Sequence, residues 1–277
     1  MQTQAEYPST PDERRAALLA RYAKQAEEEE TFRLEAAAIG ISVGELAIAK
    51  GRAEAKGLTV QQAIAQIEEE REHRFWEMLL VRARLDAFYR DGAMQLDDFK
   101  PERLQKRIAA KNIAVRYLRS ETTPWLFFAG PNGTGKTHLA VGIALDLLWK
   151  WGGRVEFWRA SEIVQKVFDA MDGPGAMSPG KVMDHYRTVG LLVVDEFGKE
   201  SHREAVLERL EDILNHRYER RAPTILTSNK TVDEIAGFSP SLASRLLDKS
   251  VVTVVDMAGL PDYRRQKTPG RTLNPTE

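Results

Sequence analysis

Several common features are absent from this 277-residue sequence. It contains no cysteine, which excludes disulfides and thiolate zinc sites and fits a reducing compartment. Its formal net charge is −1, so any binding of nucleic acid must use a local groove and not a generally basic surface. No apolar run approaches the roughly 18–20 residues of a membrane span, and the polar start shows no signal peptide. We therefore expect a cytoplasmic protein with no membrane partner.

One glycine-rich segment carries the strongest functional signal. Residues 130–137 read Gly-Pro-Asn-Gly-Thr-Gly-Lys-Thr, after an apolar run at 125–129 and before a helix-forming stretch at 138–151. This is the order of a phosphate-binding P-loop, whose glycines let backbone N–H groups close around phosphate oxygens. Lys136 is expected to reach the β and γ phosphates, and the Thr137 hydroxyl to bind Mg²⁺. The predicted nucleotide-binding residues are Gly130, Pro131, Asn132, Gly133, Thr134, Gly135, Lys136, Thr137 and His138.

Two later apolar runs also end in polar side chains. The run at 191–194 leads into Asp195 and Glu196, a Walker B pattern, and ligands of parallel sheets sit at such carboxyl ends. Asp195 is expected to hold Mg²⁺ through its water shell, and Glu196 to act as the general base on the attacking water. The run at 223–228 ends at Asn229, which could orient that water as a sensor 1 residue.

Two arginines near the end of the chain are candidates for contact with phosphate. Arg245 lies just before the last predicted strand, where an arginine can reach the γ-phosphate held by a neighbouring subunit. Arg264 follows that strand and is a weaker candidate for a nucleotide-sensing role. An exposed surface arginine is the alternative interpretation of Arg245.

The pattern from residue 125 onward predicts an α/β fold. Strands are expected at 125–129, 154–158, 190–194, 223–227 and 250–255, with helices between them. Such alternation favours a parallel sheet flanked by helices. Glycine and proline predict a loop across 172–180.

The N-terminal third reads as helix. Residues 36–43 and 53–60 form a weak repeat, in which a glycine ends one helix and a Ser or Thr caps the next. A DNA-reading helix-turn-helix has similar spacing, but residues 44–49 offer no base-reading Arg, Asn or Gln, so scaffolding or partner docking is favoured. The predicted apolar helix at 66–90 packs on its own domain or meets a partner.

A break at Asp91-Gly92 marks the predicted domain boundary. We expect a helical partner-docking domain at 1–92, an ATPase domain at 93–265 and a flexible tail at 266–277.

With these residues in view, residues 96–265 resemble the AAA+ ATPases of the DnaC/DnaI helicase-loader and IstB-like group. The shared segments are 125–130, 135–140, 192–198, 227–229, 244–246 and 262–264. The resemblance implies a five-stranded AAA+ core with little or no C-terminal lid, and ATP with Mg²⁺ as cofactors. It also implies that Arg245 is a finger acting in trans and Arg264 a sensor 2 equivalent. Some loaders carry a second arginine where Lys249 stands here, so which of the two is the finger stays open.

The resemblance implies two functions. The first is an ATP-dependent loader of a hexameric, DnaB-type replicative helicase, which self-assembles on single-stranded DNA with ATP and releases on hydrolysis. The alternative is an IstB-type transposition helper that grips duplex DNA and recruits a transposase. A nucleotide-gated adaptor with little hydrolysis is a third possibility, against which Glu196, Asn229 and Arg245 argue. Candidate DNA contacts are Lys166, Phe168, Met171, Lys181, His185, Arg187, Lys199, His202 and Arg203.

Overall fold

The computed structural model describes residues 11–90, 94–172, 178–199 and 204–263. The chain divides into two compact units between Trp76 and Glu77, inside helix α3 (Val60–Ala83). The break at Asp91-Gly92 in the sequence instead predicts a boundary at residue 92. The difference arises because the last turns of α3 bury Leu79 and Leu80, and Leu79 lies against Gly153 of the second unit.

The first unit is helical, as expected. It comprises α1 (Pro11–Ile39), α2 (Val43–Lys56) and the start of α3. The repeated capping pattern is present: Ser42 and Glu45 form a capping box at the start of α2, and Thr59 pairs in the same way with Gln62. Each preceding helix ends at a glycine with positive φ, where a side chain would be strained.

Three alanines form the centre of one hydrophobic cluster in the first unit. Ala49, Ala53 and Ala63 are buried, with Val60, Ile64 and Ile67 packed around them. Because Ala49 belongs to the segment considered as a DNA-reading helix, its burial favours helix packing over base recognition.

The second unit contains a five-stranded sheet in which every pairing is parallel. Its strands are β1 (Trp125–Ala129), β2 (Val155–Arg159), β3 (Leu191–Phe197), β4 (Thr224–Ser228) and β5 (Val252–Asp256). Their order across the sheet is β2-β3-β4-β1-β5. The predicted parallel sheet is therefore confirmed, and the carboxyl ends of β1, β3 and β4 lie side by side.

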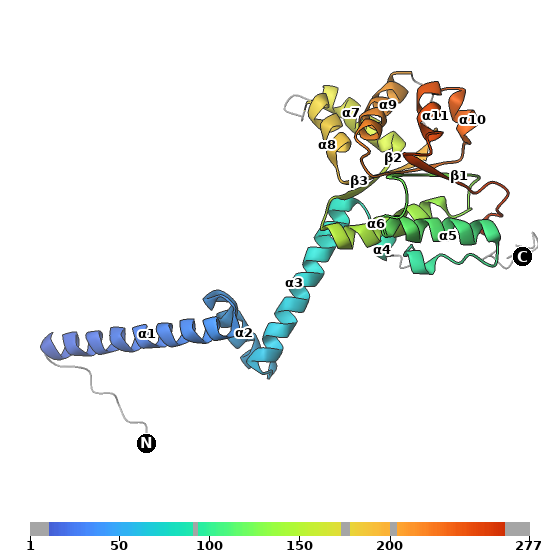
Figure 1. Cartoon of the computed structure of the whole chain (residues 1–277). Helices are drawn as coiled ribbons and strands as arrows, with labels where there is room; N and C mark the ends of the chain where they lie inside the picture. Colours follow the sequence, from blue (N-terminus) through green and yellow to red (C-terminus); the bar gives the residue numbers. More distant parts are fainter. Residues whose placement is uncertain (1–10, 91–93, 173–177, 200–203, 264–277) are drawn as a thin grey trace, which may run out of the picture. The chain divides into compact units, whose positions relative to one another are not determined.

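Helices cover both faces of this sheet (Figure 1). They are α4 (Asp86–Arg90), η1 (Leu96–Asp98), α5 (Gln105–Leu118), α6 (Lys136–Trp151), α7 (Ala160–Asp172), α8 (Pro179–Thr188), α9 (Glu204–Glu219), α10 (Val232–Ala236) and α11 (Pro240–Leu246). Helices α5 and α6 lie on one face, and α7 to α11 on the other. The described residues after β5, 257–263, form no helical lid. No helix in the described ranges combines the length and apolar character needed to cross a bilayer.

Two sequence expectations about helices need correction. The helix predicted at 66–90 is interrupted, because Arg84 adopts φ 61° between α3 and α4. The loop predicted through residue 180 is shorter, because Pro179 starts α8 at its first helical position, where the fixed φ of proline suits a helix.

A buried arginine of α9 forms hydrogen bonds with the residues that precede strands β3 and β4. Arg217 is 0% exposed and donates to the carbonyls of Tyr186 at 2.9 Å, Val189 at 2.8 Å and Pro223 at 2.5 Å. Burial lowers the pKa of Arg217 to about 10. The charge is retained because its N–H donors meet this set of carbonyl oxygens.

Candidate nucleotide-binding site

The P-loop connects β1 to α6 and holds its lysine with three oxygens. Lys136, the first residue of α6, donates from Nζ to the carbonyls of Gly130 at 2.7 Å and Pro131 at 2.8 Å, and to Asn229 Oδ1 at 2.8 Å. Gly135 precedes the helix with φ 103°, a conformation that favours glycine. The predicted lysine and the predicted sensor amide are therefore in direct contact.

The Walker B aspartate lies beneath the loop. Asp195 is 4% exposed, and its Oδ1 accepts from the hydroxyls of Thr137 at 2.9 Å and Thr227 at 2.5 Å. Burial raises the pKa of Asp195, and these two hydrogen bonds oppose that shift without cancelling it. A divalent cation beside this oxygen would favour the charged carboxylate.

Thr137 and Asp195 are the residues that could hold Mg²⁺. Within the described ranges no group of three or more His, Asp or Glu side chains could hold a metal by itself. A magnesium ion fits this pair because it keeps most of its water and needs only one or two protein oxygens beside phosphate.

Glu196 is held at the rim of the pocket by its backbone and its side chain. It has φ 62°, and its N–H donates to Thr227 Oγ1 at 3.1 Å. Its Oε1 accepts from Lys199 Nζ at 2.6 Å. Thr227 therefore bonds both neighbouring acids, the Asp195 carboxylate and the Glu196 backbone. Its role follows from strand pairing and was not singled out from the sequence.

The site opens into a pocket of about 510 Å³. Its lining residues are Met94, Asp98, Phe99, Lys100, Arg107, Asn132, Gly133, Thr134, Gly135, Lys136, Thr137, His138, Glu196, Lys199, Thr227, Asn229 and Tyr263. Most predicted nucleotide-binding residues are among them. Gly130 and Pro131 instead support Lys136 through their carbonyls.

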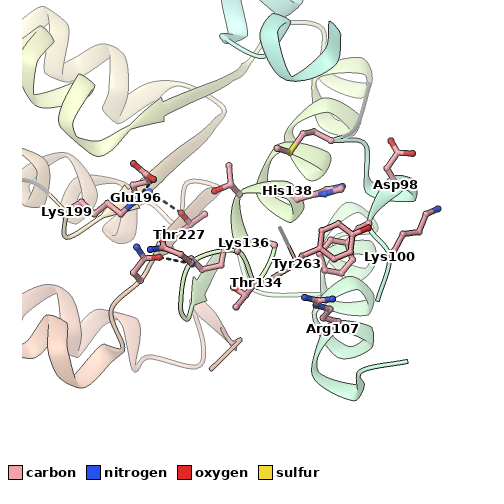
Figure 2. Close-up of a pocket in the computed structure, with 17 residues that line it drawn as sticks. Asp98, Lys100, Arg107, Thr134, Lys136, His138, Glu196, Lys199, Thr227 and Tyr263 are labelled. Atoms are coloured by element: carbon pink, nitrogen blue, oxygen red, sulfur yellow. Dashed lines mark hydrogen bonds and ion pairs between the residues drawn. The ribbon is translucent and has the colours of Figure 1, made fainter. Parts of the chain in front are cut away.

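The pocket has two ends (Figure 2). Glu196, Lys199 and Thr227 lie on one side of Lys136. His138, Tyr263 and Arg107 lie on the other side. The first end carries the Walker B glutamate. The second end, called the aromatic end below, carries the rings of Phe99, His138 and Tyr263 beside the charged Asp98, Lys100 and Arg107.

The residues at the aromatic end were mostly missed in the sequence. Phe99 packs edge-on against His138, with ring centroids 5.3 Å apart, and it lies so close to Gly135 that a Cβ there would meet its ring at 2.5 Å. No short motif marks Phe99 or Arg107. Tyr263 belongs to the 262–264 segment shared with the AAA+ group that the chain resembles, but no motif in the sequence indicates a role for it.

The segment after β5 passes directly over the P-loop. The Met257 N–H donates to the Ala129 carbonyl at 2.7 Å, and the Tyr263 N–H to the Gly133 carbonyl at 2.9 Å. A Cβ at Gly133 would lie 1.7 Å from Asp262 Oδ1. The φ of 74° at Gly133 favours glycine, and any side chain there would also displace the Asp262 carboxylate.

Arg245 lies on α11 and does not line the pocket of its own chain. Its Nη1 donates to the Ser241 carbonyl at 3.0 Å and to the Ser241 hydroxyl, and its guanidinium lies 5.5 Å from the Tyr218 ring centroid. Lys249 is exposed, and Arg264 lies outside the described residues.

The candidate DNA contacts are only partly accessible. Lys166 and Lys181 are exposed, but Phe168 packs against the hydrophobic core, which disfavours a base-stacking role. His185 contacts Glu156 at 2.8 Å, and Arg187 pairs with Asp184 and Asp212. The Met171 side chain, His202 and Arg203 lie outside the described part of the chain.

Comparison with known proteins identifies relatives of two kinds. Over 149 residues the chain is 32% identical to an insertion-sequence protein of Mycobacterium tuberculosis described as ATP-binding, covering 52% of this chain and 57% of that protein. Over 122 residues it is 28% identical to the replicative helicase loader DnaC of Escherichia coli, covering 44% and 48% respectively. The chain thus spans about half the length of these curated relatives.

Structural comparison agrees at the level of the fold. The crystal structure of the DnaC helicase loader matches with a TM-score of 0.50 and 22% identity, over 58% of this chain and 96% of that chain. A family model described as IstB-like ATP binding protein matches residues 49–268. On this match and its AAA+ core, the chain belongs to the IstB-like ATP binding protein family.

Proposed function

We propose that this protein is a Mg²⁺-dependent ATPase that assembles on DNA and serves a mobile genetic element as a transposition helper. The observation that carries the ATPase assignment is the meeting of Lys136, Thr137, Asp195, Glu196 and Asn229 at the carboxyl ends of β1, β3 and β4. Phosphate oxygens would replace the carbonyls now bound by Lys136. Magnesium at Thr137 and Asp195 would neutralise developing charge on the phosphates.

Glu196 and Asn229, which line the pocket, would carry out the hydrolytic step. Glu196 takes the proton of the attacking water, and the Asn229 amide orients that water. Arg245 supplies charge to the γ-phosphate of a neighbouring subunit, since it does not line its own pocket. Arg264 is kept as a nucleotide-sensing candidate from the resemblance.

The mobile-element assignment is supported by the insertion-sequence relative, which is 32% identical. In this role the ATP-bound assembly grips duplex DNA and recruits a transposase. Residues 1–92 would dock the partner, and residues 93–265 would bind and hydrolyse ATP. The predicted tail at 266–277 lies outside the described residues.

A second candidate is a loader that places a DnaB-type replicative helicase on single-stranded DNA. It is favoured by the 28% identity to E. coli DnaC. The helical first unit would dock the helicase, and its exposed Leu34 and Ile48 are side chains that a partner could cover.

DNA preference separates the two candidates. Binding to duplex and single-stranded DNA of one sequence would be measured with a non-hydrolysable ATP analogue, at one stated salt concentration. We expect tighter binding to duplex, and no nucleotide dependence in Lys136→Ala. A preference for single strands would overturn the transposition role in favour of the loader. If the protein bound duplex and single-stranded DNA equally well without ATP, the proposal that nucleotide drives assembly on DNA would be overturned.

A further inference from the structure

The aromatic end of the pocket is held in place by a buried arginine. Arg107, in the first turn of α5, is 1% exposed and lines the pocket. Its Nη1 donates to Glu102 Oε2 at 2.5 Å, and its Nη2 to the Pro261 carbonyl at 2.8 Å. Its Nε has no hydrogen-bond partner among the described residues. A buried charge with an incomplete set of partners is costly, which indicates a role beyond fastening two chain segments.

Arg107 also contacts the aromatic ring that faces the pocket. Its guanidinium lies 5.3 Å from the ring centroid of Tyr263, and Figure 2 shows both side chains on the same side of Lys136. The Tyr263 backbone is fixed by the Gly133 carbonyl, and the Pro261 carbonyl two residues earlier is fixed by Arg107. The position of the Tyr263 ring therefore depends on both the P-loop and Arg107.

The neighbouring lysine provides an internal comparison. Lys106 Nζ donates to Asp256 Oδ2 at 2.9 Å and to the Ala258 carbonyl at 2.8 Å. It fastens the same segment after β5 from the same turn of α5, but it does not line the pocket. Lys106 thus anchors this segment without lining the pocket, whereas Arg107 does both.

We propose that Arg107 is a positioning residue that sets the affinity for the base of the bound nucleotide, by holding the Tyr263 ring where the base stacks. This rests on the proposed binding of ATP. Once the P-loop holds the phosphates, the aromatic end is the part of the pocket left for the base. Stacking on an aromatic ring is a general mode of base recognition, and a guanidinium over the ring fixes its place.

The test compares a ligand that has a base with one that lacks it. Isothermal titration calorimetry would give the dissociation constants of Mg–ATP and of inorganic tripolyphosphate, which carries only the phosphates. In Arg107→Met we expect ATP to bind about tenfold more weakly, as for one weakened base–aromatic stack, and tripolyphosphate to bind within about twofold of the parent. Lys106→Met should leave both constants unchanged, and Arg107→Lys should restore part of the ATP affinity.

Because Arg107 is buried, its loss could also unfold the protein. Tyr263→Ala is therefore the second variant, and it should show the same selective loss for ATP, whereas Tyr263→Phe should not. Equal weakening of ATP and tripolyphosphate in Arg107→Met and Tyr263→Ala would overturn the proposal, as would unchanged ATP affinity. If the parent protein bound no ATP at all, the proposed function itself would fail.

Discussion

At the scale of single residues, Glu196 combines an unusual backbone with a partly exposed carboxylate. A non-glycine residue with φ 62° is strained, and such strain persists only where the surroundings enforce it. Thr227 and Lys199 do so here, through the backbone and the side chain respectively. The carboxylate is thereby held at the pocket rim and not extended into solvent.

Glu196→Gln tests whether this carboxylate acts as the base. The amide keeps the size of the side chain but cannot take a proton, so we expect kcat for ATP hydrolysis to fall by about 10²–10⁴-fold. ATP affinity should stay within about threefold, since Lys136 and the loop are intact. Turnover assays and calorimetry would measure the two quantities. Glu208→Gln, on the exposed side of α9, is the control, and full activity in Glu196→Gln would contradict the assignment.

Arg217 shows the opposite case, a charged residue with a structural task. Arg217→Met leaves the carbonyls of Tyr186, Val189 and Pro223 without this donor, so we expect the free energy of unfolding to fall by about 3 kcal/mol. Denaturant unfolding would measure the loss. Arg209→Met, at an exposed position of the same helix, should change it by less than about 0.5 kcal/mol; equal effects would show that Arg217 is not the anchor.

At the scale of secondary-structure elements, the packing of α6 on η1 decides where Phe99 lies. A Cβ at Gly142 would be 2.9 Å from the Leu96 backbone nitrogen. Alanine is intrinsically a better helix former than glycine. Glycine is nevertheless favoured at position 142, because the Leu96 backbone leaves no room for a Cβ.

Gly142→Ala should therefore destabilise the protein by about 1–3 kcal/mol, through overpacking. It should also weaken ATP binding, because η1 leads directly into Phe99 of the pocket. Thermal unfolding and calorimetry would measure both effects. Gly180→Ala in α8 is the matched control: a Cβ there meets nothing within 4 Å, and we expect unchanged or slightly higher stability. A stabilised Gly142→Ala would refute the packing argument.

The contact between β2 and α8 should make stability depend on pH. The hydrogen bond to Glu156 raises the pKa of His185, and this contribution is lost as pH rises above 6.5 through the folded value. Burial would raise the pKa of Glu156, but hydrogen bonds from His185 and Trp158 lower it, and this contribution is lost as pH falls below 4.5. The pair therefore contributes most between these two values.

His185→Gln should consequently destabilise the protein more at pH 5.5 than at pH 8, in urea unfolding at both values; the two pH values lie about one unit below and 1.5 units above the ordinary histidine pKa. In a protein that already carries Glu156→Gln, the loss of stability caused by His185→Gln should no longer depend on pH. A pH-independent effect of His185→Gln would show that only packing is involved.

The sequence predicts which residues lie together where these residues belong to one loop or to the end of one strand. Lys136, Thr137, Asp195 and Asn229 each follow an apolar run, and the parallel sheet gathers such ends at one edge. Phe99, Arg107 and Tyr263 follow no such rule, because they meet only when segments before β1 and after β5 pack together. Thr227 was overlooked for a related reason, since its two acid contacts come from pairing between β3 and β4.

At the scale of the whole molecule, the location of Arg245 outside its own pocket predicts that active sites are completed between neighbouring subunits. If Arg245 serves a neighbouring pocket, Arg245→Ala and Glu196→Gln proteins should each be nearly inactive, yet a mixture should hydrolyse ATP faster than the sum of the two. In mixed assemblies an intact Arg245 from one protein meets an intact Glu196 from the other.

Activity of the mixture would be followed across mixing ratios at fixed total protein. Lys249→Ala is the comparison for the alternative finger: if its mixtures show complementation and those of Arg245→Ala do not, the finger is Lys249. Simple addition of the two rates in every mixture would contradict action in trans.

The pocket also carries a consequence for the order in which the protein becomes functional. Arg107 and its partner Pro261 are 154 positions apart. The P-loop at 130–137 lies between them in the sequence, so it is also synthesised before the segment after β5 that packs over it. Domains generally fold as units, and contacts between distant segments close late. Because β1 pairs with β4 and β5, which are both made later, we expect that the nucleotide pocket cannot be completed until the segment after β5 has emerged. ATP, by binding only the finished pocket, would selectively stabilise chains in which the segment after β5 has already been made.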